Sequence, residues 1–312
     1  MRSLRLSMEG IEYRRGDARI LKGISWRVAA GEHWSVLGPN GSGKTSLMMI
    51  ATGYEPASRG DVFLVAGDIG EIVLPDVRKK IGFVSSQLTD IMVQHRPRVT
   101  GLETALSGRH ASLGLYEKPS ARAIRDAKRV LAELGALHLA EVPFSKMSTG
   151  QRQICLIARC YMTRSRLVIL DEPCAGLDLA TREIVLRTLT EEIRRHPATP
   201  QILVTHHPEE IVPGITHVLL LRGGEVVAQG RREKVLTRRN LERAYNVPLR
   251  VVHQDGRVWI VPRRQRQQQL PRISRMATDY RRQRQRALQR CSLLPVIRVI
   301  REIRGKKRCR PT

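Results

Sequence analysis

The sequence predicts an α/β fold with a mainly parallel β-sheet at its core and an antiparallel strand region at its start. Short apolar runs typical of buried strands, "WSVL", "LVIL" and "ILVT", recur between segments whose apolar residues have helical spacing. Residues 1–30 instead alternate apolar and polar residues around the turn "RRGD", a pattern typical of short antiparallel strands. The sequence contains no internal repeat, so we expect one domain of this class per chain.

The later elements follow in an order that suits this class. An apolar strand ending at Leu37 leads into a glycine loop and a helix that we expect to end at Gly53. Residues 78–87 indicate a short strand and a loop, and residues 99–142 carry Ala, Leu, Arg and Glu at helical spacing. We expect a further helix after Ser148. Strands at 166–173 and 201–207 should then flank a helix at 181–196, and a hairpin should follow at 216–230.

Composition excludes several classes of protein. The apolar content of 41% allows a sizeable core, and aromatic residues are only 4%, so aliphatic side chains must supply most of it. No apolar run approaches the roughly 18 residues that span a bilayer, and the N-terminus lacks the apolar stretch of a secretory signal. The five cysteines form no CxxC pair, which argues for a reducing compartment and against a zinc site. We therefore expect a cytoplasmic protein.

Charge divides the chain into two parts. The net charge is +26, and residues 263–312 hold fifteen arginines and two lysines against two acidic residues. These residues also contain the Gln/Arg-biased runs "RRQRQQQ" and "YRRQRQRALQR". We predict a folded domain over residues 1–262 and a polybasic, disordered tail over residues 263–312.

A glycine-rich loop follows the first apolar strand. Its residues "GPNGSGKT" fit the pattern G-x-x-x-x-G-K-[ST] between a strand and a helix. The glycines let backbone N–H groups curl around an anion, and the helix adds the partial positive charge of its N-terminus. Lys44 can reach the β- and γ-phosphates of a nucleotide, and the Thr45 hydroxyl can ligate Mg²⁺. The residues predicted to bind ATP here are Gly38, Pro39, Asn40, Gly41, Ser42, Gly43, Lys44, Thr45 and Ser46.

Two adjacent carboxylates end the apolar run "LVILDE". Asp171 is placed to hold the coordination shell of Mg²⁺, and Glu172 could polarise an attacking water. Taken alone, the pair could equally cap the end of a strand or the start of the next helix. The glycine loop in the same chain favours the catalytic interpretation.

The segment "KMSTGQRQICLIAR", residues 146–159, predicts a helix whose N-terminus is almost uncovered. Ser148 would cap this helix, while Thr149 and Gly150 leave its first turn bare. A bare helix N-terminus can bind an anion through its N–H groups and its dipole. The alternative is a simple capped helix.

Taken together, "GPNGSGKT", "LVILDEPCAGLD", "LVTHH" and "MSTGQ" resemble the motifs of the ATP-binding cassette (ABC) family, in that family's order, over residues 1 to about 255. The resemblance implies a P-loop NTPase fold with an antiparallel β subdomain and an inserted helical subdomain at about 88–165. It also implies that two cassettes pair head to tail, so that a signature segment of one chain contacts the ATP of the other. In this chain the signature segment is Ser148, Thr149, Gly150 and Gln151. Met147 and Thr149 stand where the family usually has Leu and Gly, and we expect activity to survive both changes.

Other roles are implied by the resemblance alone. Gln87 resembles the glutamine that reaches Mg²⁺ and the attacking water, and His206 resembles the histidine that contacts the γ-phosphate and orients Glu172. Asp178 resembles the aspartate at the contact between two cassettes. Tyr13 could stack on adenine, although a strand residue packed on its sheet is nearly as plausible. The implied Mg²⁺ contacts are Thr45, Gln87 and Asp171.

These features favour the ATP-hydrolysing subunit of an ABC transporter, with ATP and Mg²⁺ as cofactors. The implied partners are a transmembrane permease and a second cassette, most simply an identical one, at the inner face of the cell membrane. Segments such as "THHPEEI" and "VLTRRNLERAYNVPL" are most similar to those of the cassettes of iron-complex and molybdate importers. The alternative is a soluble ABC ATPase that acts on ribosomes or nucleic acid. The tail could bind anionic lipid or nucleic acid, or have no role.

Overall fold

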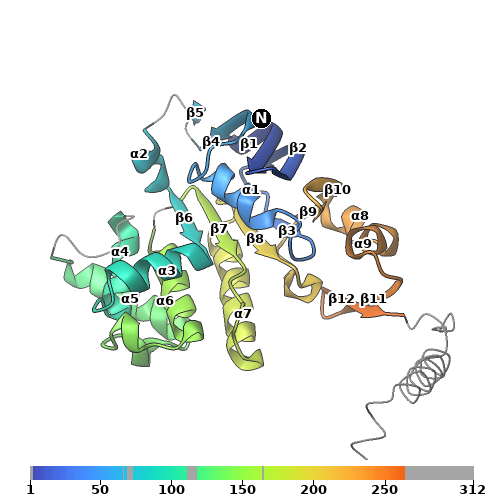
Figure 1. Ribbon diagram of the computed structural model, residues 1–312. Helices are drawn as coiled ribbons and strands as arrows, with labels where there is room; N and C mark the ends of the chain where they lie inside the picture. The colour runs from blue at the N-terminus through green and yellow to red at the C-terminus, as the bar shows by residue number, and fades with distance from the viewer. Residues whose placement is uncertain (1–2, 66, 69–72, 111–117, 164, 264–312) are drawn as a thin grey trace, which may run out of the picture. The chain divides into compact units, whose positions relative to one another are not determined.

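The structure is a computed structural model that describes residues 3–65, 67–68, 73–110, 118–163 and 165–263 (Figure 1). The chain divides into two compact units, and the boundary between them falls after Arg263. Apart from Arg263, the predicted tail lies outside the described residues. Among the helices of the described ranges, none combines the length and apolar character needed to cross a membrane.

A six-stranded sheet forms the centre of the first unit. Its strand order is β10-β9-β3-β8-β7-β6, and every neighbouring pair is parallel except β9 with β10. Every residue of β3, β6 and β7 is buried, which explains their continuous apolar sequences. The predicted α/β class with a mainly parallel sheet is therefore confirmed. The strands are β3 (Trp34–Leu37), β6 (Ile81–Val84), β7 (Leu167–Asp171), β8 (Gln201–Thr205), β9 (His217–Arg222) and β10 (Glu225–Arg231).

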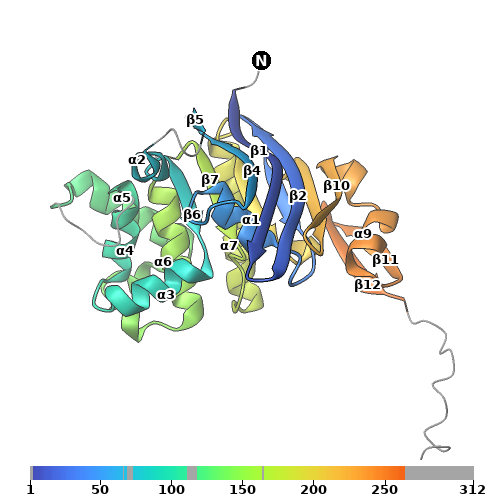
Figure 2. The same ribbon diagram turned by 45° about the horizontal axis from the view of Figure 1, so that its top comes forward.

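An antiparallel sheet packs against one face of the central sheet through a shared apolar core, and its strands stand in front in Figure 2. Its first two strands form the hairpin expected around the turn "RRGD", although each has 12 residues and neither is short. Two further strands of this sheet were not predicted, because they lie in a polar segment without clear alternation. In the order β2-β1-β4-β5 the sheet contains β1 (Leu4–Arg15), β2 (Ala18–Ala29), β4 (Arg59–Leu64) and β5 (Gly67–Asp68).

Helix α1 (Lys44–Ala51) joins the two sheets. It starts directly after the glycine loop and contacts β1, β2, β4 and β7. Its apolar residues Leu47, Met48 and Ile50 are buried in a core between the sheets. The core therefore fixes the start of α1 relative to the ends of the central strands.

Helices cover the other face of the central sheet. The N-caps of α4, α5 and α6 are Thr100, Ser120 and Ser148, and each side chain accepts a hydrogen bond from the backbone at position N3. The apolar faces of these helices and of α7 form a second core with the sheet. Between α1 and β8 the α-helices are α2 (Leu74–Arg78), α3 (Ser86–His95), α4 (Gly101–Ser107), α5 (Ala121–Glu133), α6 (Thr149–Met162) and α7 (Leu179–Arg195).

The described chain ends in a small C-terminal segment, residues 232–262, whose hairpin turns at Asp255 and Gly256. A bidentate ion pair of 2.8 Å, between Arg257 and Glu183, joins this hairpin to α7. No helix or strand was predicted for this segment from its sequence. Its elements are α8 (Arg232–Val235), α9 (Arg238–Tyr245), β11 (Leu249–Gln254) and β12 (Arg257–Pro262).

Candidate functional site

The parallel strands bring the predicted site residues to one edge of the central sheet. Strands β3, β7 and β8 are neighbours and run in the same direction, so their carboxyl ends meet. The glycine loop follows β3, Glu172 follows β7, and His206 follows β8. Three motifs that are far apart in the sequence therefore converge.

Close packing explains two glycines of the loop, Gly38 and Gly43. A Cβ at Gly38 would clash with the carbonyl oxygen of Leu221, and a Cβ at Gly43 would lie 2.6 Å from Cδ2 of Leu21. Gly43 also has φ +94°, a conformation that side chains disfavour. Asn40 is exposed in the loop, whereas Ser42 is buried.

Lys44 lies folded over the same loop. Its Nζ donates hydrogen bonds to the carbonyl oxygens of Gly38, at 3.0 Å, and Pro39, at 3.2 Å. It also lies 3.5 Å from Oε1 of Glu172, and its side chain is only 6% exposed. A buried ammonium group beside the loop can hold the negative charge of a phosphate.

Asp171 and Thr45 form a polar pair at the start of α1. Burial raises the pKa of Asp171 to about 6, and a hydrogen bond from the Thr45 hydroxyl partly opposes this shift. Among the described residues, Asp171 Oδ1 and Ser42 Oγ are buried without a hydrogen-bond partner. A carboxylate oxygen and hydroxyl groups are ligands that suit Mg²⁺, which also retains water and phosphate ligands. The residues present therefore fit a magnesium ion.

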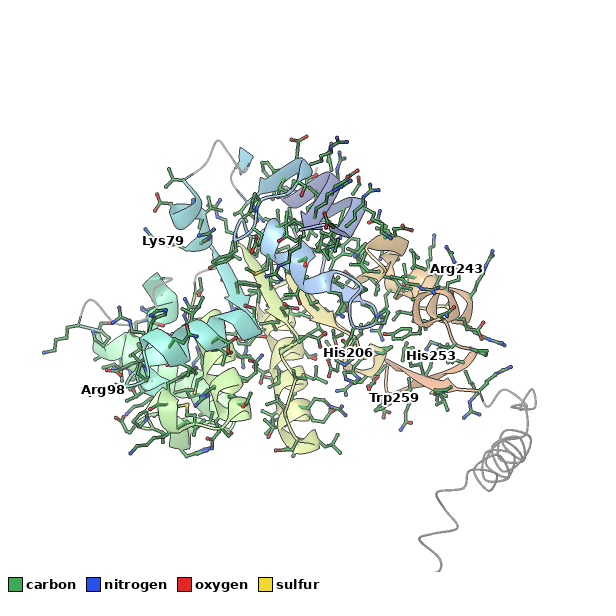
Figure 3. All side chains as sticks on the ribbon, viewed as in Figure 1. Lys79, Arg98, His206, Arg243, His253 and Trp259 are labelled. Carbon is green, nitrogen blue, oxygen red and sulfur yellow. The ribbon has the colours of Figure 1, made fainter. Side chains whose placement is uncertain are left out.

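Glu172 and His206 contact each other directly. Nδ1 of His206 lies 3.0 and 2.9 Å from the two carboxylate oxygens of Glu172. Glu172 has φ +50°, which is rare for a residue with a side chain and is often found at functional sites. Figure 3 shows His206 at the end of β8, next to the C-terminal segment that carries His253. The neighbouring His207 instead pairs with Glu209 at 3.2 Å.

The structure adds residues that the sequence analysis missed. Nε2 of Gln153, in α6, lies 3.5 Å from the carbonyl oxygen of Glu172. Thr205 donates a hydrogen bond to the buried carboxylate of Glu210, whose pKa is raised by burial. The Tyr245 hydroxyl donates to the carbonyl oxygen of His206 at 2.8 Å. No sequence motif marks these contacts, because their partners meet only in the tertiary structure.

The signature segment forms a second cluster with Asp178. Ser148 Oγ accepts from the backbone N–H of Gln151, and Gln151 Oε1 accepts from the backbone N–H of Ser148. Asp178 caps α7 by accepting from the backbone N–H and the hydroxyl of Thr181. These residues, with Thr149 and Gly150, line a cavity of about 540 Å³. The predicted cap at Ser148 is confirmed, and the helix N-terminus borders an open cavity.

The remaining predicted residues lie in α1, α3 and β1. Gln87 lies in the first turn of α3, and its side chain is outside the described part of the structure. Thr45 and Ser46 lie in the first turn of α1. Tyr13 pairs with Leu21 across β1 and β2, so it lies near the glycine loop that Leu21 borders. Its hydroxyl donates to Glu55 at 3.3 Å, which leaves both interpretations of Tyr13 open.

Comparisons with known proteins identify similar sequences. The family model described as "ABC transporter" matches residues 21–175. The ABC transporter ATP-binding protein YlmA of Bacillus subtilis is 36% identical over 256 residues, which cover 82% of this chain and 96% of the relative. The molybdate import ATP-binding protein MolC of Haemophilus influenzae is 28% identical over 245 residues, which cover 78% and 89%.

Two solved structures have a fold similar to that of this chain. A metal-chelate type ABC transporter in an inward-facing conformation has a TM-score of 0.64 and 26% identity, covering 84% of this chain and 98% of that one. The ATP-binding cassette MJ0796, a dimer in a post-hydrolysis state with ADP and Pi, has a TM-score of 0.62 and 23% identity. That match covers 72% of this chain and 98% of the cassette, and it is a similarity of fold.

Proposed function

We propose a mechanism from the premise that this chain belongs to the ABC transporter family and is an ATP hydrolase of that family. The contact of Glu172 with both His206 and Lys44, beside the glycine loop, carries the proposal. In this arrangement a carboxylate, an imidazole and an ammonium group surround the place where the terminal phosphate of ATP would lie. We propose that the chain uses ATP to energise a separate transmembrane permease.

Each group at the edge of the sheet has a proposed task. The backbone N–H groups of the glycine loop and Lys44 bind the phosphates of ATP. Glu172 orients a water molecule and accepts its proton, while His206 holds Glu172 in position. Thr45, Asp171 and Gln87 would hold Mg²⁺, which neutralises charge on the phosphates when bound.

We propose that hydrolysis requires a second copy of the chain. The cavity beside the signature segment leaves the start of α6 open to a phosphate held by another chain. Ser148 and Gly150 would supply hydroxyl and backbone N–H donors to that phosphate. Because one chain carries both the glycine loop and the signature segment, two identical chains would complete two sites. The dimeric cassette with the same fold supports this arrangement.

We further propose a role in uptake. The relative named for molybdate import and the similar metal-chelate type transporter support a small charged solute or metal complex as the cargo of the permease. In this proposal the chain works at the cytoplasmic face of the membrane, bound to that permease. The solute would contact the permease and not the described residues of this chain.

A Glu172→Gln variant tests the hydrolytic site. Because glutamine keeps the shape of the side chain but accepts a proton poorly, the variant should bind ATP, dimerise and hydrolyse it at least about 100-fold more slowly. Turnover and size-exclusion chromatography with ATP would measure both effects. Glu209→Gln is the matched control, since Glu209 pairs with His207 outside the proposed site. A Glu172→Gln monomer with normal turnover would contradict the mechanism.

Purification of partners tests the transport role. Tagged Glu172→Gln chain with ATP would be isolated from detergent-solubilised membranes, with and without residues 263–312, and co-purified proteins identified by mass spectrometry. We expect a stoichiometric polytopic membrane protein with both forms. Ribosomal proteins or nucleic acid instead, lost when the tail is deleted, would favour the alternative ATPase.

A further inference from the structure

The C-terminal segment makes a polar contact with the backbone of His206. The hydroxyl of Tyr245, the last residue of α9, donates a hydrogen bond of 2.8 Å to the carbonyl oxygen of His206. The two residues are 39 positions apart in the sequence. The contact therefore depends on how α9 packs against the segment that carries His206.

Other hydrogen bonds hold the residues next to His206, but the Tyr245 hydroxyl bonds to His206 itself. Behind His206, the Thr205 hydroxyl donates to Glu210 and accepts from the backbone N–H of His207. These contacts fix the residues on either side of His206. Tyr245 supplies the hydrogen bond to the His206 backbone itself. The imidazole then extends from this backbone to the carboxylate of Glu172.

The position of Tyr245 is itself set by the C-terminal segment. Thr237 caps the start of α9, and Arg222 of β9 donates to the carbonyl oxygen of Arg243. The carboxylate of Glu242, which lies in α9, accepts from the backbone N–H of Leu249, which begins the hairpin. A shift of the hairpin or of α9 would thus move the Tyr245 hydroxyl relative to His206.

We infer that Tyr245 is a positioning residue for His206, and that it couples the C-terminal segment to the ATP site. This inference rests on the proposed role of His206. The hydroxyl holds the His206 backbone so that Nδ1 stays within hydrogen-bond distance of Glu172. Displacement of the segment by a bound partner would release the histidine and slow hydrolysis, without altering the glycine loop that binds ATP.

A Tyr245→Phe variant of the full chain tests the inference, because it removes only the hydroxyl. We expect kcat for ATP hydrolysis to fall by about tenfold, the effect of losing one hydrogen bond at a catalytic group, while KM for ATP stays within about twofold. A purely structural role would lower the melting temperature and leave kcat of the folded protein unchanged. That result would overturn the inference.

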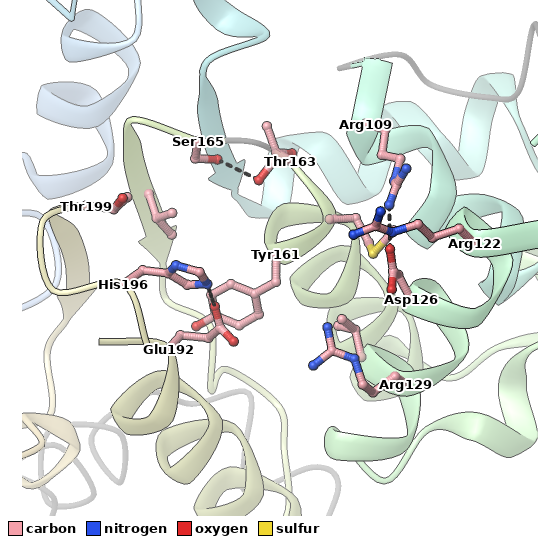
Figure 4. Close-up of a pocket in the computed structure, with 13 residues that line it drawn as sticks. Arg109, Arg122, Asp126, Arg129, Tyr161, Thr163, Ser165, Glu192, His196 and Thr199 are labelled. Carbon is pink, nitrogen blue, oxygen red and sulfur yellow. Dashed lines mark hydrogen bonds and ion pairs between the residues drawn. The ribbon is translucent and has the colours of Figure 1, made fainter. Parts of the chain in front are cut away.

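Tyr161→Phe is the matched control. Tyr161 is also partly buried against the helical core, and its hydroxyl has no hydrogen-bond partner among the described residues. It lines a separate cavity of about 560 Å³ between α5, α6 and α7, which Figure 4 shows with Glu192 and His196 nearby. Removing this hydroxyl should leave kcat unchanged. An equal loss of activity in both variants would also overturn the inference.

A double-mutant cycle with His206→Ala tests whether Tyr245 affects hydrolysis through His206. If Tyr245 acts through His206, then Tyr245→Phe should cause no further loss of single-turnover rate in the His206→Ala background. Independent, multiplicative losses would overturn the inference. If His206→Ala alone leaves the rate unchanged, the proposed role of His206 fails, and this failure is visible separately from any effect of Tyr245.

Imidazole nitrogen signals give a readout that does not depend on hydrolysis. In ¹⁵N-histidine-labelled protein, Tyr245→Phe should shift or broaden the His206 signals, which a His206→Asn variant would assign. The signals in Tyr161→Phe should match those of the unmodified protein. Unchanged His206 signals in Tyr245→Phe would overturn the inference even if activity fell.

Discussion

Replacing Asp171 by asparagine should make the nucleotide-free protein more stable while it impairs the ATP site. Asp171 is 4% exposed, and burial raises the pKa of its carboxyl from 3.8 to about 6. One pKa unit corresponds to about 1.4 kcal/mol, so keeping this carboxylate charged in the folded state costs about 3 kcal/mol near pH 8. An asparagine side chain at this position would avoid most of this cost because an amide carries no charge.

The raised pKa of Asp171 determines the direction of this stability change and the pH range over which it occurs. A carboxyl whose pKa is higher in the folded state favours folding while it is protonated, and this contribution is lost as pH rises through about 6. The advantage of Asp171→Asn should thus be largest at pH 8 and fall to about half at pH 5. At pH 8 we expect a gain of about 2–3 kcal/mol in the free energy of unfolding, or about 5–10 °C in melting temperature.

Urea unfolding of both proteins at pH 5 and pH 8, without nucleotide, measures this difference. Asp178→Asn is a control of opposite sign, because hydrogen bonds from Thr181 lower the pKa of the Asp178 carboxyl. That variant should be less stable at neutral pH, since it weakens a helix cap. If Asp171→Asn were no more stable than the original protein at pH 8, the assigned cost of burying this charge would be wrong. Mg²⁺ with a non-hydrolysable nucleotide should stabilise the original protein more than Asp171→Asn.

Three further predictions concern the backbone, the helix cap and the C-terminal segment. Gly38→Ala should abolish ATP binding in isothermal titration calorimetry, because the added Cβ would clash with the carbonyl oxygen of Leu221; normal affinity would contradict the packing described. Ser148→Ala should cost about 1 kcal/mol in unfolding experiments and weaken ATP-dependent dimerisation in sedimentation, whereas loss of stability alone would limit this residue to capping. Arg257→Lys should lower the free energy of unfolding by about 1 kcal/mol at low salt and less at high salt, because the bidentate contact with Glu183 is partly exposed; an effect independent of salt would point to packing instead.

Local sequence determined much of the fold. Continuous apolar runs predicted the parallel strands because these strands are buried on both faces and admit few polar residues. The glycine loop was recognisable because Gly38 and Gly43 lie where a side chain would clash or adopt an unfavourable backbone conformation. The sequence also predicted the cap at Ser148, since capping involves only residues three positions apart.

Other features depend on packing between distant segments. Strand β4 and the hairpin of β11 and β12 were missed because their burial is set by neighbouring elements and leaves no clear periodicity. The raised pKa of Asp171 arises only once β7 is enclosed by β6, β8 and α1, because burial is its cause.

The sequence by itself determined the motifs on which the predicted ATP site rests, because each motif combines residue types and backbone freedom that are local properties. Only the tertiary structure decided how those motifs are held together. The distance of 2.9 Å between His206 and Glu172 follows from the register of adjacent parallel strands. The hydrogen bond from Tyr245 follows from the packing of α9, and a residue 39 positions away cannot be recognised as its partner from local pattern.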